Sequence, residues 1–178
     1  LDQLVMRGHS TPRKGRAALR SEMEVTLSSQ PGDAYAIDEA LDRIRLWRHA
    51  ELLRVGLEDL AGNLTPRAVM RQFSDIADTL VSAALRLART AVDKRFTKRE
   101  TLTSAGEAGQ GFLVVGLGRL GSREMTYGSD LDLIFLYDED GALPPGAERH
   151  VYEAKLAQKL IATISVPTAA GVAFEVDT

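Results

Sequence analysis

Residues 115–137 of the 178-residue chain read VGLGRLGSREMTYGSDLDLIFLY, and this stretch largely decides the fold. It begins at the end of an apolar run, Phe112 to Val115, that predicts a buried strand. It closes with a second predicted strand, Leu131 to Tyr137. Between the strands lies a glycine-rich turn over residues 116–121, followed by an expected short helix over residues 122–126. Because glycines let a backbone approach a ligand closely, the turn is a candidate phosphate site.

Two aspartates stand at the start of the second strand. Alternation along a strand puts Asp130 and Asp132 on one face, roughly 6.5 to 7 Å apart. Mg²⁺ prefers oxygen ligands, and paired Mg²⁺ ions in phosphoryl-transfer sites lie about 3.5 to 4 Å apart. The pair is therefore a candidate metal site, and Asp177, on an expected last strand over residues 172–177, joins it if the strands are neighbours. Asp-x-Asp at a strand edge is also common as a turn cap.

The glycine spacing allows a second interpretation. Gly116, Gly118 and Gly121 match the fingerprint of dinucleotide-binding folds, and Asp138 stands near the offset of a ribose-binding acid. Only nine residues separate Gly121 from Leu131. This is too short for the usual crossover helix between parallel strands. A dinucleotide-binding oxidoreductase domain is the weaker alternative.

The first hundred residues predict helices. A short helix is expected over residues 15–28, a long one from Ile37 to Leu60, and another from the capping pair Thr65-Pro66. Two long amphipathic helices joined by about three residues should pack antiparallel. The apolar positions of the first are Ile37, Leu41, Ile44, Trp47, Leu53, Leu57 and Leu60, and those of the second are Val69, Phe73, Ile76, Leu80, Ala84, Leu87 and Ala91.

Together these elements predict an α+β chain. Residues 1–105 form a helical region, and residues 106–178 form a small sheet with flanking helices, one of them over residues 147–165. A helical module that only docks a partner protein is a further alternative for the first region.

Composition limits the classes of function. The chain is 44% hydrophobic, carries a formal net charge of −3 and has no cysteine. Such a chain can bury a core, is not suited to binding nucleic acid in general, and has no thiol chemistry. The missing cysteines fit a cytoplasmic location. No apolar run reaches the roughly 18 to 20 residues of a membrane span, so no membrane association is expected.

Gly121-Ser122, a gap of seven residues, Asp130-x-Asp132 and a later Asp177 together resemble the polymerase-β-like nucleotidyltransferase superfamily. The longer stretch 115–137, with the helical run Leu41 to Gly62 and the segment Phe174 to Asp177, is similar to the bifunctional glutamine synthetase adenylyltransferase/adenylyl-removing enzymes. This resemblance implies Mg²⁺-dependent transfer of AMP from ATP to a tyrosine of glutamine synthetase. It also implies a PII signal protein as a possible partner of the full-length enzyme.

Carried over by position, the resemblance assigns roles to six residues. Gly121 and Ser122 would bind the ATP phosphates, with Arg119 near them. Asp130 and Asp132 would ligate Mg²⁺, and Asp177 would complete the metal site or accept the tyrosine proton.

The resemblance also bears on which half of the enzyme this is. These enzymes have two homologous halves, and the form Ser-Asp-Leu-Asp-Leu at residues 129–133 looks more like the C-terminal, adenylylating one. The adenylyl-removing half, which releases ADP by phosphorolysis, is the alternative because it uses the same carboxylates. The family continues past Asp177 with an arginine-containing segment that this chain lacks, which predicts a core truncated at its C-terminal end.

Overall fold

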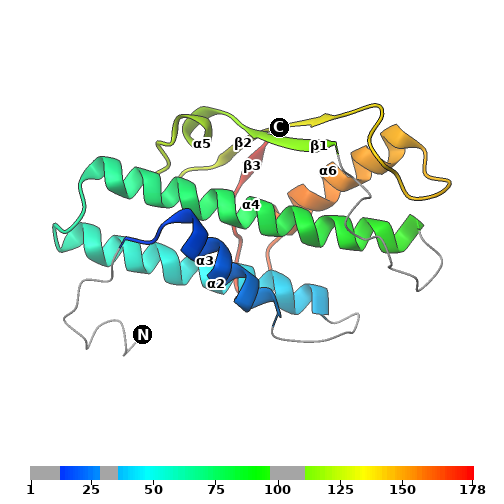
Figure 1. The fold of residues 1–178 in the computed structure, drawn as a ribbon. Helices are drawn as coiled ribbons and strands as arrows, with labels where there is room; N and C mark the ends of the chain where they lie inside the picture. The colour runs from blue at the N-terminus through cyan, green and yellow to red at the C-terminus, as the bar shows by residue number, and fades with distance from the viewer. Residues whose placement is uncertain (1–12, 29–35, 97–110) are drawn as a thin grey trace.

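The computed structural model describes residues 13–28, 36–96 and 111–178. Over these ranges the chain forms five helices and a three-stranded sheet, which confirms the predicted α+β class (Figure 1). The predicted boundary between residues 105 and 106 lies outside the described residues and stays a prediction. In chain order the elements are α2 (Arg16–Ser28), α3 (Ala36–Leu60), α4 (Pro66–Phe96), β1 (Phe112–Gly116), α5 (Gly118–Ser122), β2 (Leu131–Tyr137), α6 (Arg149–Ser165) and β3 (Val176–Asp177).

Helices α3 and α4 form the expected antiparallel pair (Figure 1). Helix α3 ends where Gly62 takes a φ of +73° and the Asn63 N–H donates to the Glu58 carbonyl over 2.9 Å. This is the left-handed termination that glycine favours. Helix α4 begins with a bond of 3.3 Å from the Ala68 N–H to Thr65 Oγ1, as the capping residue predicts.

The apolar stripe predicted for α4 is confirmed from Val69 to Ala84, where its five positions are buried. The stripe predicted for the second half of α3 is wrong. Leu60 is 88% exposed there, whereas Arg54 and Glu51 are buried. These two charged side chains can be buried because they form a hydrogen-bonded ion pair with each other, and Arg54 also donates to Gln72 of α4 over 3.0 Å.

The sheet has the order β1-β2-β3. Strands β1 and β2 are antiparallel, with Phe112 opposite Tyr137 and Gly116 opposite Leu133. A dinucleotide-binding unit needs parallel strands at this point, so this pairing excludes that alternative. Strand β3 is parallel to β2 and shorter than expected, because the N–H groups of Ala173 and Phe174 bond to the Ile164 carbonyl at the end of α6.

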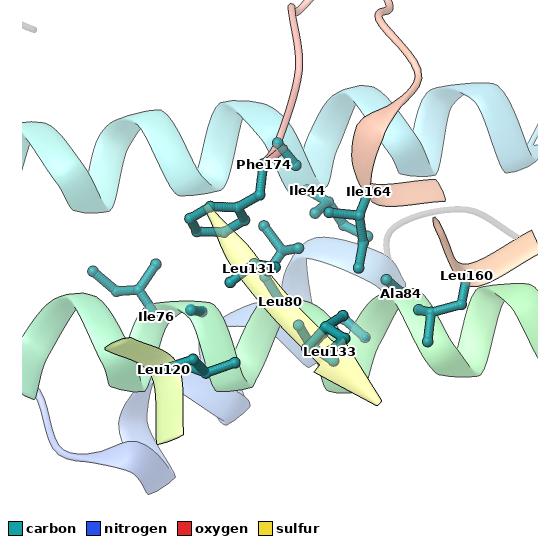
Figure 2. Close-up of a cluster of buried hydrophobic side chains, with 14 of the residues drawn as sticks. Ile44, Ile76, Leu80, Ala84, Leu120, Leu131, Leu133, Leu160, Ile164 and Phe174 are labelled. Carbon is teal, nitrogen blue, oxygen red and sulfur yellow. The ribbon is translucent and has the colours of Figure 1, made fainter. Parts of the chain in front are cut away.

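One face of β2 builds the core. Figure 2 shows Leu131 and Leu133 among side chains from α3, α4 and α6 and from the segment before β3. The burial alternates along the strand, so that Asp132 and Ile134 lie on the other face, where Ile134 is 44% exposed. Asp132 of the candidate metal site therefore lies on the face of β2 opposite the one that packs into the core.

Candidate functional site

The parallel pairing of β2 and β3 brings three aspartates together. Asp132 lies directly opposite Asp177 in the register, and Asp130 immediately precedes β2. One carboxylate oxygen from each of the three lies within 4.8 Å of the others. Asp130 and Asp177 are exposed and Asp132 is half-buried, so that the cluster opens to solvent.

The donor set of this acidic cluster (Asp130, Asp132 and Asp177) fits a divalent cation. Mg²⁺ takes a few carboxylate ligands and keeps several waters, which a solvent-open group of three carboxylates permits. Within the described residues, none of the three carboxylates forms a hydrogen bond or an ion pair.

Helix α5 begins against Asp132. The Leu117 N–H donates to the Asp132 carbonyl over 2.8 Å, and Gly118 follows with a φ of +46°. A Cβ at Gly118 would lie 2.0 Å from Asp132 Oδ2, a distance that no side-chain carbon can adopt. Only glycine therefore leaves room for this carboxylate at the start of α5.

The position of α5 corrects the sequence analysis. A helix was expected over residues 122–126, but α5 spans Gly118–Ser122 and ends at Arg123, whose φ is +66°. The first three N–H groups of a helix have no acceptor within it. These are the groups of residues 118–120, whereas the Gly121 N–H already donates to the Leu117 carbonyl over 2.8 Å.

Gly121 and Ser122 consequently stand at the C-terminal end of α5. A Cβ at Gly121 would lie 2.7 Å from the Gly116 carbonyl oxygen, so Gly121 lets the helix close onto β1. The exposed Ser122 hydroxyl lies 3.1 Å from Glu124 Oε2 and donates to it. The three aspartates are thus brought together by the fold, whereas no described hydrogen bond joins Ser122 to them.

Arg119 and Tyr127 anchor the loop that leads into Asp130. Arg119 donates to Ser129 Oγ over 3.4 Å and to Thr126 Oγ1 over 3.3 Å. The Tyr127 hydroxyl donates to Asp59 of α3 over 2.6 Å. Burial, together with this bond, raises the pKa of Tyr127 to about 12, so the phenol stays a donor near neutral pH.

An ion-pair cluster on α4 fixes α5 from the other side, and the sequence analysis missed it. Arg123 pairs with Asp75 and Asp78, and Arg16 of α2 reaches the same Asp75 over 2.7 Å. These residues lie more than 40 positions apart from Arg123 in the chain, and charged residues on a helix ordinarily face water. No local pattern could have identified them.

No helix among the described residues is long and apolar enough to cross a membrane. Fold and site together define an α+β protein with an acidic centre at one end of a small mixed sheet.

Comparison with known proteins assigns the chain to a family. The sequence model of glutamate-ammonia ligase adenylyltransferase matches residues 1–178. A relative from Mesorhizobium japonicum is 39% identical over 148 residues, which cover 80% of this chain and 14% of the relative. A relative from Brucella melitensis is 34% identical over 165 residues, which cover 89% of this chain and 16% of the relative. A relative from Ralstonia nicotianae is 40% identical over 142 residues, which cover 80% of this chain and 13% of the relative.

Each of these relatives is named a bifunctional glutamine synthetase adenylyltransferase/adenylyl-removing enzyme. The chain belongs to the glutamate-ammonia ligase adenylyltransferase family. It spans 13–16% of the length of these relatives.

Proposed function

We propose that this chain carries the catalytic centre of a glutamine synthetase adenylyltransferase, which transfers AMP from ATP to a tyrosine hydroxyl of the synthetase. The observation that carries the proposal is the convergence of Asp130, Asp132 and Asp177 within 4.8 Å. The family supports it, as do the names of the relatives. We also propose that the sheet and its helices correspond to the polymerase-β-like core and that residues 106–178 form it.

The reaction is a displacement at the α-phosphorus of ATP. The tyrosine oxygen forms a bond to this phosphorus while the bond to the β-phosphate oxygen breaks, and pyrophosphate leaves. Bound Mg²⁺ would supply positive charge to the attacking and leaving oxygens. Asp130 and Asp132 would hold it, and Asp177 would complete the site or accept the tyrosine proton.

The residues around α5 would orient the nucleotide. Arg119 of α5 donates to Ser129 in the loop before Asp130 and would offer a cation to the phosphates. Of the Gly121-Ser122 pair, the Ser122 hydroxyl would bind a phosphate oxygen from the end of α5, and Gly121, whose N–H already donates to the Leu117 carbonyl, would contribute by letting α5 pack closely on β1. Ser122 would then exchange its bond to Glu124 for one to the nucleotide. In the longer family enzymes, a PII signal protein would act as a regulatory partner.

A transfer assay tests the proposal. The chain is incubated with Mg²⁺, glutamine synthetase and ATP radiolabelled at the α-phosphate, and label on the synthetase tyrosine is measured. Asp130→Ala and Asp132→Ala should each abolish transfer, because a lost metal ligand removes charge stabilisation of several kcal/mol. Asp140→Ala, at an exposed position beyond the other end of β2, is the matched control.

A second assay, which supplies adenylylated synthetase and phosphate in place of labelled ATP, distinguishes the two directions of the reaction. Label on the synthetase supports the adenylylating half. Release of ADP from adenylylated synthetase and phosphate, without forward transfer, would assign the chain to the adenylyl-removing half. If neither reaction occurs in the longer enzyme that contains this chain, the proposal is contradicted.

A further inference from the structure

A pocket of about 330 Å³ adjoins the acidic cluster. Its walls are α3, the end of α6, the loop before β2 and residues 172–175, which lead into β3. Asp130 belongs both to the pocket and to the acidic cluster, so a group bound in the pocket can reach the aspartates. The volume lies at the lower end of the range for ligand pockets, about 300 to 1,000 Å³, and suits one aromatic side chain better than a whole nucleotide.

One wall of this pocket combines a cation with an aromatic ring. The Cζ of Arg48 lies 4.2 Å from the centre of the Phe174 ring, and both residues line the pocket. The ring stabilises the half-buried guanidinium. Because the guanidinium is planar and stacks on aromatic faces, Arg48 can take a second ring from the pocket.

The charge of the pocket favours a neutral ligand. Asp130 and Glu175 are both exposed at its wall, and their carboxylates repel a phosphate or carboxylate group. The phenol of tyrosine has an ordinary pKa of about 10 and is neutral at physiological pH. It also donates a hydrogen bond, which a carboxylate accepts.

The direction of the proposed displacement favours this side of the acidic cluster for the acceptor. The attacking and leaving oxygens lie roughly in line, on opposite sides of the α-phosphorus. The proposed function puts the leaving pyrophosphate at α5, which follows β1 at one edge of the sheet. Residues 172–175 of the pocket lead into β3 at the other edge, and Figure 2 shows Leu120 of α5 and Phe174 on opposite sides of Leu131.

We infer that this pocket binds the phenol ring of the acceptor tyrosine, against Arg48 and Phe174 and with the hydroxyl toward the aspartates. The inference rests on the proposed function. It holds for both halves of the family, because the tyrosine oxygen attacks in one direction and leaves in the other. Ser129 marks the boundary between the two substrates, since it lines the pocket and its Oγ accepts a hydrogen bond from Arg119, the residue proposed to meet the phosphates.

Ser165→Trp in the longer enzyme tests the inference, because an indole at this position would fill the pocket. The KM for the synthetase should rise by about tenfold or more, whereas the affinity for Mg-ATP, measured by calorimetry, should stay that of the wild type. Thr90→Trp on α4 is the matched control. Like Ser165, Thr90 bonds through its hydroxyl to the carbonyl four residues earlier in its helix, but it is exposed and lies outside this pocket.

A titration of the 178-residue chain tests the same pocket without turnover. N-acetyl-tyrosinamide is the probe, N-acetyl-alaninamide is its control, and the amide NMR signals of Ser165 and Phe174 are followed. The tyrosine probe should shift both signals saturably, and the alanine probe should not. Arg48→Lys should weaken binding by about threefold or more, because lysine keeps the charge and loses the planar face.

Each outcome decides the inference. A wild-type KM for the synthetase in Ser165→Trp overturns it. A loss of Mg-ATP affinity in this variant also overturns it, because the pocket would then hold the nucleoside. If Ser165→Trp lowers the thermal midpoint, the titration of the unmodified chain decides instead: saturable shifts with the tyrosine probe support the inference, and their absence contradicts it.

Failure of the inference is distinguishable from failure of the proposed function. If Asp132→Asn abolishes transfer and Ser165→Trp keeps the wild-type KM, the pocket assignment is wrong and the function stands. If Asp132→Asn transfers AMP as the wild type does, the metal role of the aspartates is wrong, and the titration with the tyrosine probe decides the pocket independently.

Discussion

Gly118 lies where any side chain would strike the carboxylate of Asp132. Its missing Cβ would stand 2.0 Å from Oδ2, and its φ is +46°. Gly118→Ala should therefore displace this carboxylate and weaken Mg²⁺ binding by about tenfold or more. The left-handed backbone should add a stability loss of about 1 to 2 kcal/mol. Titration calorimetry and urea unfolding measure the two effects.

Gly146 provides the control for this prediction. It has a φ of +79°, but a Cβ there would meet nothing within 4 Å. Gly146→Ala should lose a similar amount of stability and keep the affinity for Mg²⁺. Wild-type Mg²⁺ affinity in Gly118→Ala would show that the space beside Asp132 is unimportant.

Glu153 of α6 supplies a prediction about pH. It is 3% exposed, its Oε2 has no partner, and its Oε1 lies 3.7 Å from Arg149. Burial raises the pKa of Glu153, against the opposing effect of Arg149 and Arg89. The folded chain then binds more protons here than the unfolded chain, so that this group's contribution to stability falls as pH rises through the window between the two pKa values.

Glu153→Gln should accordingly raise the thermal midpoint at about pH 7, and the difference from wild type should shrink at about pH 4. Thermal unfolding at both pH values measures this, with Glu139→Gln at an exposed position as the control. A lower midpoint for Glu153→Gln at neutral pH would show that pairing with Arg149 outweighs the cost of burial.

At the scale of elements, α4 determines where α5 lies. Arg123 ends α5 with a φ of +66° and pairs with Asp75 and Asp78 of α4. The Met125 N–H also meets Ser74 Oγ of α4 at 3.4 Å. Since α5 begins against Asp132, these contacts connect the helical region to the acidic cluster.

Arg123→Asn tests this connection, because asparagine tolerates the left-handed backbone and removes both ion pairs. We expect a loss of about 1 to 2 kcal/mol in urea unfolding, since Asp75 is buried and, among the described residues, keeps only Arg16 as an ion-pair partner. Arg43→Gln, which breaks an exposed pair with Glu39, should lose less than about 1 kcal/mol. Equal, small losses in both variants would contradict the role of Arg123.

The elements also show what sequence patterns can and cannot predict. The stripe of α4 is a periodic signal and is confirmed from Val69 to Ala84, and the predicted strand β2 is confirmed with burial that alternates at its start. The glycine-rich stretch indicated a turn because glycine disfavours helices, yet α5 forms inside it, where Gly121 is needed for contact with β1. Leu53, Leu57 and Leu60 in the second half of α3 face outward, because Arg54 on the inward side meets its partner Gln72, 18 positions along the chain.

At the scale of the whole molecule, the core joins the two predicted regions. Leu80 of α4, Leu131 of β2 and Leu160 of α6 belong to one buried cluster (Figure 2). The Tyr152 hydroxyl donates to Asp93 across α6 and α4 over 2.7 Å, and burial raises the pKa of Tyr152. Asp130 and Asp132 could be proposed from their spacing alone. The position of Asp177 beside them could not be predicted in this way, because it depends on the pairing of strands more than 40 residues apart. The pocket at Arg48 could not be predicted either, because distant segments of the chain form it.

Mg²⁺-dependent ATP binding by the 178-residue chain tests the acidic cluster most directly. Isothermal titration calorimetry compares wild type with Asp132→Asn and Asp177→Asn, and Asp140→Asn is the control. We predict that Mg²⁺ raises the ATP affinity of the wild type and of the control by about tenfold or more, and that both cluster variants lose this increase without a change in thermal midpoint. Equal ATP affinity with and without Mg²⁺, in the wild type and in the cluster variants alike, would contradict the metal role of the three aspartates.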